Sequence, residues 1–513
     1  MRKIKITTYS HFYRVTIDCT DTMEIFRRFT SRFLQWGFVK QNRQMVRRPI
    51  KVFAAAPKNR AWVHYHINTL PEFLQFLKEN HYTDEFIEIT KIPVNMKKIK
   101  KAKFKILPHM KPRDEQPDAI EYLVDPNSPT SLFLGLQTGK GKSFCALYAL
   151  SKFGYRFGMV IKPMYIDKWL VDFQKATDLN LKEDVVVVRG SKQLIELQQM
   201  VKAKTIDFKA VIFSNMTLLH WLKLYEEIQD EIFELGYCCR PHELCEFLGF
   251  GPRVTDESHQ DFHFNFKLSL YTHVWKTLDM SATLVNEDNF INRMYETLLP
   301  GKERFNTRVY DAYILGKALI YNLDEPRQVQ TTQWGQKTYS HTAFEASILR
   351  KPKLKANYFH LIKWSIDVSY LAAYVPGNKC MVFCSSVEMC TELTEYLSKQ
   401  FPQFDVRRYV GTMGDPRENL IDSDIRVSTL QSGGTAQDVP NLQTTILTTS
   451  INSQQANEQG LGRTRKMKDG QKPIFLWFVC EDIPKHVEYH RKKREILDGK
   501  LANYATLRFG GKI

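Results

Sequence analysis

The sequence predicts an α/β protein with two lobes, each built on a parallel sheet, and a small basic α+β domain in front of them. From residue 106 onward, short apolar segments alternate with amphipathic helical segments, as in a parallel sheet covered by helices. A polar stretch at 335–353 interrupts this alternation, which then starts again. The first hundred residues have a separate pattern of strands and helices and a strong excess of positive charge.

The composition is that of a folded, globular chain. Of the 513 residues, 43% are hydrophobic and 25% are charged, which excludes a largely disordered or fibrous protein. No apolar run approaches the ~20 residues that span a bilayer, and the first residues lack the apolar core of a secretory signal. Nine cysteines without a repeating framework fit a reducing compartment, so we expect a cytoplasmic protein.

Residues 1–96 are expected to form the basic domain. Residues 1–110 hold 22 Lys and Arg but only 8 Asp and Glu, so +14 of the net charge of +17 lies in this segment. Nucleic acid is the expected partner, and an ordinary soluble surface is the alternative. The candidate contacts lie beside aromatic residues: Arg27, Arg28, Arg47 and Arg48. The periodicity predicts strands at 13–17, 46–54, 61–67 and 86–92 and helices at 21–37 and 71–79, the first ended by Gly37.

A lysine-rich segment, 97–105, is expected to link this domain to the first lobe, either solvated or also touching phosphates. We expect the first lobe at 106–334, a connector at 335–355 and the second lobe at 356–513. The predicted strands are 131–136, 158–161, 184–188, 210–214 and 254–256 in the first lobe, and 380–384, 405–409, 425–429, 444–448 and 473–478 in the second.

A glycine-rich turn between a predicted strand and a predicted helix reads SLFLGLQTGKGKS over 131–143. Its glycines let backbone N–H groups close around phosphate oxygens, and the N-terminus of the following helix adds positive potential. In this context Lys142 is expected to reach the β- and γ-phosphates of a nucleotide, and Ser143 to hold Mg²⁺.

Two adjacent carboxylates stand at the end of another predicted strand, in VTDESH at 254–259. Together with the upstream turn they suit nucleotide hydrolysis, because Asp256 would bind Mg²⁺ through water while Glu257 would orient or deprotonate the attacking water. For the pair taken alone, a polar turn at the strand exit is the alternative reading.

These two segments and several others resemble, in the same order, the motifs of superfamily 2 helicases. The others in the first lobe are KPRDEQPDAI (111–120), VIKPMYIDKW (160–169), FSNMTLL (213–219) and MSATL (280–284). Those in the second lobe are VFCSSVEMC (382–390), YVGTMGD (409–415), IRVSTLQSGGTAQDVPNL (425–442) and QGLGRTRKM (459–467). Within the superfamily, the opening YSHFYRVTIDCTDT and the RDEQ segment are similar to the UvsW-type bacteriophage helicases.

The resemblance implies two RecA-like lobes of the P-loop NTPase class that bind ATP and Mg²⁺. It implies that ATP is bound by Arg113, Gln116, Thr138, Gly139, Lys140, Gly141, Lys142, Ser143, Arg465 and Lys466, and that Ser143 and Asp256 hold the metal. The residues implied for hydrolysis are Lys142, Asp256, Glu257, Gln459 and Arg463. The residues implied to couple hydrolysis to movement are Ser281, Thr283, Thr429 and Gly434, and those implied to contact nucleic acid are Lys162, Pro163, Ser214 and Ser385.

Three positions depart from the family pattern. Leu136 replaces a small residue at the start of the phosphate loop, which could alter the nucleotide fit. Ser258 stands between Glu257 and His259 where the family has Ala or Cys. Lys466 occupies the place of an arginine, with Arg465 just before it, and lysine cannot form the planar guanidinium fork. The contact to the γ-phosphate is therefore open between these two.

The resemblance implies an ATP-dependent DNA helicase or translocase that unwinds or branch-migrates forked, junction or R-loop DNA in phage replication and recombination. It implies action in the host cytoplasm as a monomer or transient oligomer. The expected partners are single-stranded, forked or branched DNA and an RNA–DNA hybrid, without a membrane. Three alternatives remain: an RNA helicase, a duplex-DNA translocase that separates no strands, and a nucleic-acid-binding module whose ATPase has decayed.

For two further segments the sequence is compatible with two interpretations each. Zinc accepts the ligand types of the cluster Cys238, Cys239, His242 and Cys245, but no second knuckle follows, and buried or free thiols are the alternative. The tail at 486–497 is expected to be a helix whose basic face either touches DNA or is solvated.

Overall fold

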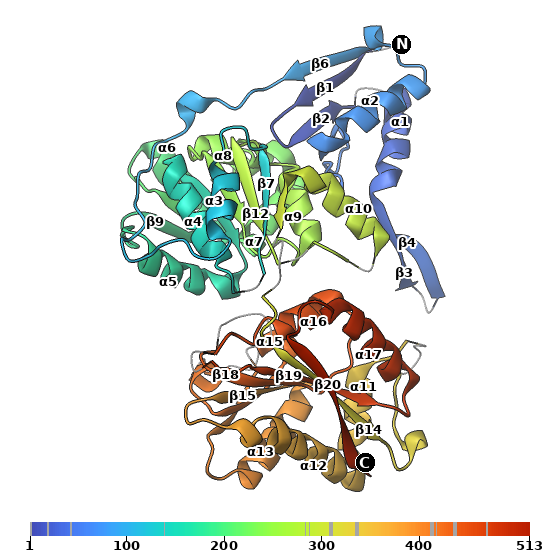
Figure 1. Ribbon diagram of the computed structural model, residues 1–513. Helices are drawn as coiled ribbons and strands as arrows, with labels where there is room; N and C mark the ends of the chain where they lie inside the picture. Colours follow the sequence, from blue (N-terminus) through green and yellow to red (C-terminus); the bar gives the residue numbers. More distant parts are fainter. Residues whose placement is uncertain are drawn as a thin grey trace. The chain divides into compact units, whose positions relative to one another are not determined.

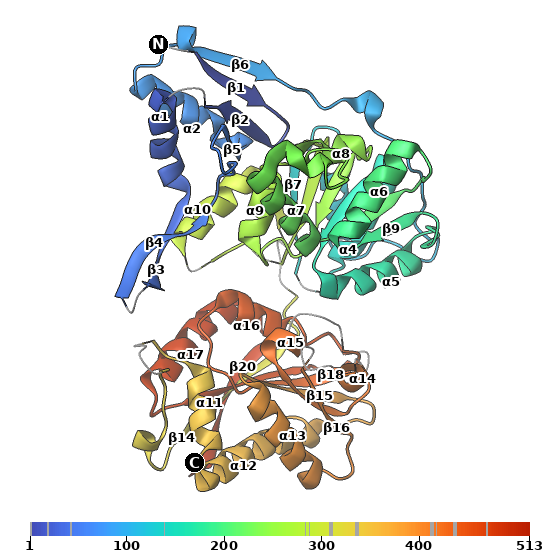
Figure 2. The ribbon, with the colours of Figure 1, turned by 180° about the vertical axis from the view of Figure 1, so that it is seen from behind.

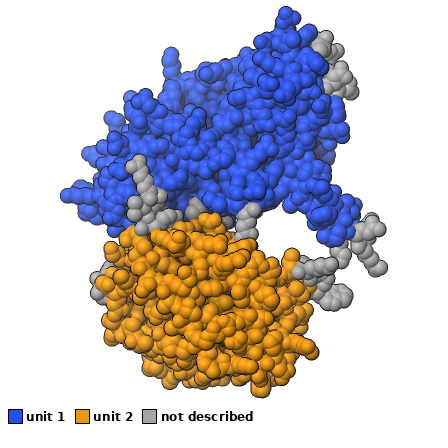
Figure 3. Space-filling model, turned by 45° about the vertical axis from the view of Figure 1, so that its right-hand side comes forward, with its two compact units in different colours: residues 1–136, 140–307 blue, residues 137–139, 308–513 orange. Residues whose placement is uncertain are grey.

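The computed structural model describes residues 3–17, 20–41, 44–137, 139–282, 284–286, 288–306, 311–333, 338–410, 415–416, 418–433, 439–467 and 470–513. Tertiary contacts divide the chain into two compact units, Met1–Leu136 with Lys140–Thr307, and Gln137–Gly139 with Arg308–Ile513 (Figure 3). Each unit contains a seven-stranded parallel sheet, and a smaller mixed sheet lies near the N-terminus. The predicted fold class is therefore confirmed.

The first unit is built on the strands β7 (Ser131–Gly135), β8 (Phe157–Ile161), β9 (Val185–Val188), β10 (Ala210–Ser214), β11 (Pro252–Thr255), β12 (Lys276–Met280) and β13 (Arg304–Asn306), in the order β13-β7-β12-β11-β8-β10-β9. Its helices are α3 (Gln116–Val124), α4 (Lys142–Phe153), α5 (Ile166–Ala176), α6 (Ser191–Ala203), α7 (Asn215–Ile228), α8 (Leu244–Phe247), α9 (Phe262–Ser269) and α10 (Asn289–Leu298). α3 and α4 lie on the face turned to the viewer in Figure 1, and α7 and α9 on the face seen in Figure 2. Because helices cover both faces, the central strands are buried along their whole length.

A four-stranded sheet near the N-terminus packs against this lobe. Its strands are β1 (Ile4–Thr8), β2 (Phe12–Thr16), β5 (Trp62–His66) and β6 (Ile87–Lys91), in the order β5-β2-β1-β6. α1 (Thr20–Thr30) and α2 (Leu70–Glu79) supply an aromatic core with the sheet, in which Tyr13 meets Phe73. Phe12 and His64 alternate along their strands with residues of that core, and both are also fully buried. The Nδ1 of His64 donates to the Leu270 carbonyl at 2.8 Å. One hydrophobic core therefore runs from the N-terminal sheet into the lobe.

The segment between α1 and β5 differs from the prediction. The helix predicted over 21–37 ends at Thr30, and Gly37 lies inside β3 (Leu34–Gln41), which pairs antiparallel with β4 (Gln44–Val52). The helical spacing of aromatic residues stops at Phe33, and the strand that follows depends on a partner further along the chain. Gly37 serves this pairing because a Cβ there would lie 2.9 Å from the Ile50 side chain.

The second unit is built on the strands β14 (Leu315–Asn322), β15 (Lys379–Cys384), β16 (Val406–Tyr409), β17 (Ile425–Thr429), β18 (Leu442–Leu447), β19 (Ile474–Cys480) and β20 (Asn503–Lys512), in the order β16-β17-β15-β18-β19-β14-β20. Its helices are α11 (His341–Leu349), α12 (Pro352–Ser369), α13 (Val387–Gln400), α14 (Glu418–Ile421), α15 (Leu430–Gly433), α16 (Gln454–Leu461) and α17 (Pro484–Leu497). Within the described ranges, no helix of either unit is both long and apolar enough to cross a bilayer.

The change from the first unit to the second comes earlier than the sequence predicted. β14 lies inside the range expected for the first lobe, 106–334, yet it pairs in parallel with β19 and β20. The expected connector, 335–355, contains α11, whose Phe344 is fully buried. The polar residues around α11 hid this helix, and the partners of β14 lie too far along the chain for a local pattern to show them. The division between the compact units falls after Thr307.

Candidate functional site

The loop between β7 and α4 turns sharply at two glycines. Gly139 and Gly141 have φ angles of +90° and +79°, a region that residues with side chains rarely adopt. Gly141 is also the N-cap of α4, so the helix begins directly after the turn. The first N–H groups of a helix have no partner within it and attract phosphate. Thr138, predicted as part of this loop, lies outside the described residues.

Gln116 joins the predicted adenine motif to the phosphate loop. Its Oε1 accepts a hydrogen bond from the Arg113 N–H at 3.0 Å, and its Nε2 donates to the Lys140 carbonyl at 2.8 Å. The Gln116 side chain is buried, and a Cβ on Gly141 would collide with its Nε2. The structure therefore brings Arg113, Gln116, Lys140 and Gly141 together, and position 141 accepts only glycine.

Lys142 folds back over the loop, and its Nζ donates to the Leu136 carbonyl at 3.3 Å. The Leu136 side chain is fully buried, so this departure from the family pattern contacts the core of the lobe. The hydroxyl of Ser143, the next residue after Lys142, hydrogen-bonds to the carboxyl group of Asp172 on α5. Asp172 was not among the predicted site residues, because a single aspartate in an amphipathic helix belongs to no motif.

Asp256 and Glu257 stand at the carboxyl end of β11. The Nε1 of Trp169 donates to Asp256 Oδ2 at 2.8 Å, and the Glu257 N–H donates to Asp256 Oδ1 at 2.9 Å. Burial and the neighbouring Glu257 carboxylate raise the pKa of Asp256, against the positive charges of Lys168 and Lys142. The lysine of the phosphate loop and Asp256 are therefore close enough to interact.

The oxygen groups at this place fit a magnesium ion that arrives with a nucleotide. The Ser143 hydroxyl, Asp256 and Asp172 are hard oxygen donors, and burial raises the pKa of Asp172, which also feels the charge of Asp256. In the described part of the chain, no three His, Cys, Asp or Glu side chains form a complete metal cage. Mg²⁺ usually binds through one or two carboxylates plus substrate phosphates, so a partial donor set suits a nucleotide site.

The segment after β11 is tied to the segment after β12. Glu257 has a φ of +47°, an uncommon conformation for a residue with a side chain. His259 Nδ1 lies 3.3 Å from Glu257 Oε2 and also hydrogen-bonds to the Ser281 hydroxyl. The DESH segment and the predicted coupling segment therefore meet inside the first unit. Thr283, the other predicted coupling residue here, lies outside the described residues.

The predicted nucleic-acid residues of the first lobe lie directly after β8 and at the end of β10. Lys162 forms an ion pair with Asp261 at 3.0 Å, and Pro163 begins the turn after it. Asp261 also accepts a hydrogen bond from Asn215 Nδ2 at 3.3 Å, and the buried Ser214 precedes Asn215. These residues lie at the carboxyl ends of parallel strands, the edge at which ligands bind in open α/β sheets.

Ser385, the predicted nucleic-acid residue of the second unit, is held by a buried carboxyl group. The N–H groups of Ser385 and Ser386 donate to the two oxygens of Glu345, each at 2.7 Å. Glu345 is fully buried, and burial raises its pKa to about 7. The Ser385 hydroxyl hydrogen-bonds to the Thr342 hydroxyl at 2.9 Å. Glu345 was not among the predicted site residues, because it lies in the polar stretch that predicts a connector.

The predicted hydrolysis residues of the second unit lie at and after α16. Arg463 and Arg465 are half-buried, whereas Lys466 is exposed. Gln459 is in α16, and its side chain lies outside what the structure describes. The choice between Arg465 and Lys466 at the γ-phosphate therefore stays a prediction.

The remaining predicted residues lie on other elements. Thr429 ends β17, and its hydroxyl donates to the Ser432 hydroxyl at 3.0 Å, whereas Gly434 lies outside the described residues. The four N-terminal arginines are exposed: Arg27 and Arg28 in the last turn of α1, and Arg47 and Arg48 on β4.

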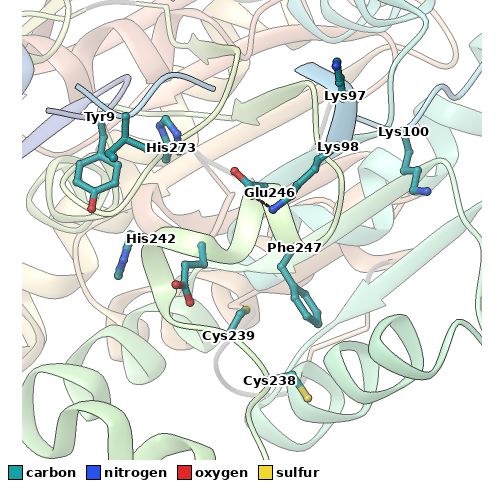
Figure 4. A pocket seen from close by; sticks show the side chains of 12 residues that line it. Tyr9, Lys97, Lys98, Lys100, Cys238, Cys239, His242, Glu246, Phe247 and His273 are labelled. Carbon is teal, nitrogen blue, oxygen red and sulfur yellow. Dashed lines mark hydrogen bonds and ion pairs between the residues drawn. The ribbon is translucent and has the colours of Figure 1, made fainter. Parts of the chain in front are cut away.

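Three of the four residues considered for zinc line a cavity of about 720 Å³ between the N-terminal sheet and the lobe of the first unit (Figure 4). Cys238, Cys239 and His242 face it. Burial raises the pKa of Cys239 and raises that of Cys245 to about 11, which keeps both thiols protonated. Burial lowers the pKa of His242 to about 3. Zinc binds thiolates, and burial disfavours the thiolate form of Cys239 and Cys245. Zinc and packed thiols both stay predictions for this place.

The lysine-rich segment 97–105 runs along the lobe. The Lys100 N–H donates to the Gly249 carbonyl at 2.9 Å, and the Ala102 N–H donates to the Gly154 carbonyl at 2.9 Å. Figure 4 shows Lys98 in its ion pair with Glu246 at the cavity wall. The segment is thus hydrogen-bonded to the lobe by its backbone.

Comparisons with known proteins bear on the fold. No protein-family model matches the sequence, and no curated protein matches it. Among solved structures, the chain is similar to S. cerevisiae Dbp5 bound to RNA and ADP BeF3, at 12% sequence identity and a TM-score of 0.50. The match covers 78% of this chain and 90% of that chain. At this identity the similarity shows the fold alone, which consists of two RecA-like lobes.

Proposed function

We propose that this protein is an ATP-dependent helicase or translocase that acts on nucleic acid. The assembly around the N-terminus of α4 supports this most. Lys142 lies near enough to Asp256 for their charges to interact, although 113 residues separate them in the chain. A phosphate loop, a lysine and paired carboxylates that follow strands of the same parallel sheet form the site that nucleotide hydrolysis needs. The presence of all three argues against a decayed ATPase.

In the proposed reaction, each group of the first unit has a distinct task. The N-terminus of α4 and Lys142 bind the β- and γ-phosphates of ATP, and Gln116 positions the loop against the adenine motif. Ser143 and Asp256 hold Mg²⁺, which supplies positive charge to the phosphate oxygens when bound. Glu257 orients the attacking water or accepts its proton.

We propose that the second unit contributes Arg463. A guanidinium at the γ-phosphate stabilises the charge that develops there during hydrolysis. If this arginine must approach from the other unit, hydrolysis requires closure of the units on ATP. Repeated closure and opening would then move the protein along one strand.

The proposed polymer is DNA in forked, junction or R-loop form, as the resemblance to UvsW-type phage helicases implies. The +14 of residues 1–110 supports a polyanionic partner. Contacts from Lys and Arg to phosphates position a protein without reading sequence, so charge alone does not separate DNA from RNA. An RNA helicase and a duplex translocase are the competing functions.

ATP turnover measured without polymer and with single-stranded DNA, fork DNA, plain duplex and RNA tests the proposal. We expect fork and single-stranded DNA to stimulate turnover. Stimulation by RNA alone would assign the protein to RNA, and no stimulation by any polymer would contradict the proposal. Strand displacement on the fork then distinguishes a helicase from a translocase that separates no strands.

A further inference from the structure

The ribbon, defined as β3 and β4 (Leu34–Val52), extends away from the N-terminal sheet (Figures 1 and 2) and has an exposed apolar surface. Six of its large apolar side chains are exposed: Trp36, Phe38, Met45, Val46, Ile50 and Val52. Trp36 is 47% exposed and Phe38 is 67% exposed. They alternate along β3, and the register places Arg47 opposite Phe38. Because side chains alternate between the faces of a strand, these three share one face.

The ribbon is also uniformly basic. Its sequence contains five Lys and Arg and no Asp or Glu. The guanidinium of Arg47 lies over the Trp36 ring, 5.6 Å from its centroid. Aromatic rings beside basic groups form the surface that binds single strands and strand ends, because bases stack on the rings while the charges meet phosphates.

The base of the ribbon is fastened to the lobe. His263 on α9 donates from Nε2 to the Val52 carbonyl at 2.7 Å. Gln35 donates to Asp288, the N-cap of α10. The ring of Phe53, the residue after β4, lies 5.0 Å from that of Phe266 on α9. The ribbon is therefore attached to two helices of the lobe at once.

These two helices directly follow the segments of the candidate site. α9 follows the DESH segment and α10 follows the MSATL segment, and the hydrogen bond from His259 to Ser281 joins those segments. A cavity of about 430 Å³ lies beside the attachment, lined among others by Lys51 of the ribbon and by Asn215 and Asp261 of the strand-end edge. The ribbon thus leads from solvent to the edge where nucleic-acid contacts are predicted.

We propose that the face with Trp36, Phe38 and Arg47 stacks on the bases at the end of a duplex and keeps the two strands apart while the protein moves along one of them. This inference rests on the proposed function. Stacking needs no particular base, which suits a motor that passes over any sequence. The attachment to α9 and α10 would carry force from the nucleotide site to the duplex end.

A second copy of the chain is the other occupant that an exposed apolar strand face suggests. The charge favours nucleic acid, because two ribbons that contain only positive charges repel each other.

The double variant Trp36→Ala, Phe38→Ala in the full chain tests the inference. Phe233→Ala is the matched control, since Phe233 is an exposed ring of the same unit with Arg240 at 5.6 Å, but Arg240 is paired with Asp230. Three quantities are compared: unwinding of a fork, ATP turnover stimulated by single-stranded DNA, and quenching of 2-aminopurine at the fork junction without ATP.

In the double variant, we expect unwinding and quenching to fall about tenfold or more, with stimulated ATP turnover and melting temperature unchanged. The conservative variant Trp36→Phe should retain most of both, and the control should match the parent. Unchanged unwinding overturns the inference. A parallel loss of stimulated turnover also overturns it, because the ribbon would then act in strand loading.

Two further outcomes are distinguishable. If the parent chain is a dimer in size-exclusion chromatography and the double variant is a monomer, the face belongs to a second copy and the inference fails. If no polymer stimulates ATP turnover of the parent chain, the proposed function fails. The quenching at the junction still decides in that case whether these rings stack on bases.

Discussion

The loop after β11 in the first unit and the loop after β15 in the second each hydrogen-bond to a carboxyl group, that of Asp256 and that of Glu345. The two carboxyl groups differ in their exposure and in the groups that they contact. Asp256 remains partly exposed, with Trp169 on one oxygen, and it interacts with the lysine of the phosphate loop. Glu345 is fully enclosed and uses its oxygens to hold the N–H groups of Ser385 and Ser386. Burial raises the pKa of both groups. The first loop leaves its carboxyl group partly exposed, whereas the second loop is fixed by a carboxyl group that is fully enclosed.

This comparison separates the expected effects of substitution. Changes around the first loop should alter turnover at little cost in stability, and changes around the second should alter stability. Arg463 is the proposed exception, because it lies in the second unit and is assigned to hydrolysis.

Arg463→Ala should therefore have the largest effect, a fall of about 1000-fold or more in polymer-stimulated ATP turnover. Binding of a fluorescent ATP analogue and the melting temperature should stay near those of the parent chain. Arg465→Ala and Lys466→Ala, measured beside it, show which of these two contributes at the γ-phosphate. If ATP turnover of Arg463→Ala stays within tenfold of the parent, the hydrolysis residues all lie in the first unit. That result would contradict the proposed role of Arg463.

Lys142→Ala should lower ATP turnover by about 100- to 1000-fold, because an ammonium aimed at the phosphates is lost from a preorganised site. DNA binding measured without nucleotide should remain. Lys152→Ala is the control on the same helix, where Lys152 is exposed in the last turn of α4. An equal loss of DNA binding and turnover would contradict the separation of the two activities.

Glu345→Gln should weaken the pH dependence of stability in the second unit. The folded pKa of about 7 lies above the ordinary 4.5, so the folded state holds this proton more tightly. Its contribution is complete below pH ~4.5 and is lost as the pH rises through 7, about 3 kcal/mol over the window. Denaturant unfolding from pH ~5 to ~8, with hydrogen exchange of residues 379–390, measures it. Glu388→Gln, an exposed residue of α13, is the control, and an unchanged slope for Glu345→Gln would contradict this assignment.

Lys493→Met should have the smallest effect, a rise of about 2–4 °C in melting temperature at neutral pH. Lys493 lies buried on α17, and burial lowers its pKa to about 7. The folded state therefore disfavours the charged form, so the cost of this lysine is full below pH ~7 and disappears toward pH ~10. Methionine keeps the apolar stem without the ammonium. Arg491→Met on the exposed side of the helix is the control, and a lower melting temperature for Lys493→Met would show that the ammonium stabilises the fold.

Much of the architecture was predictable because its signals are local. Continuous apolar runs mark strands buried on both faces, and the ten strands predicted for the two lobes lie within about two residues of their observed positions. Gln116 hydrogen-bonds to the Lys140 carbonyl although no local pattern joins the two residues. In this case the order of the motifs predicted that the two segments belong to one site. Loops that follow parallel strands reach the same edge of a sheet, so motif order translates into proximity.

The unpredicted parts depend on partners far along the chain. β14 is a strand because β19 and β20 flank it, and β3 is a strand because β4 pairs with it. Asp172 and Glu345 were not predicted for a different reason. A carboxylate gains its role from what surrounds it in space, and neither the helix around Asp172 nor the polar stretch around Glu345 contains a recognisable spacing.

The continuity between the N-terminal sheet and the lobe has a practical consequence for anyone who wishes to trim this protein to a minimal ATPase. Deleting residues 1–96 would expose the Leu270 carbonyl and the rings that surround Phe53 to water. Such truncated proteins would report on aggregation as much as on DNA affinity. Point substitutions of exposed arginines are the better test of DNA affinity, because they leave the contact between the N-terminal sheet and the lobe intact.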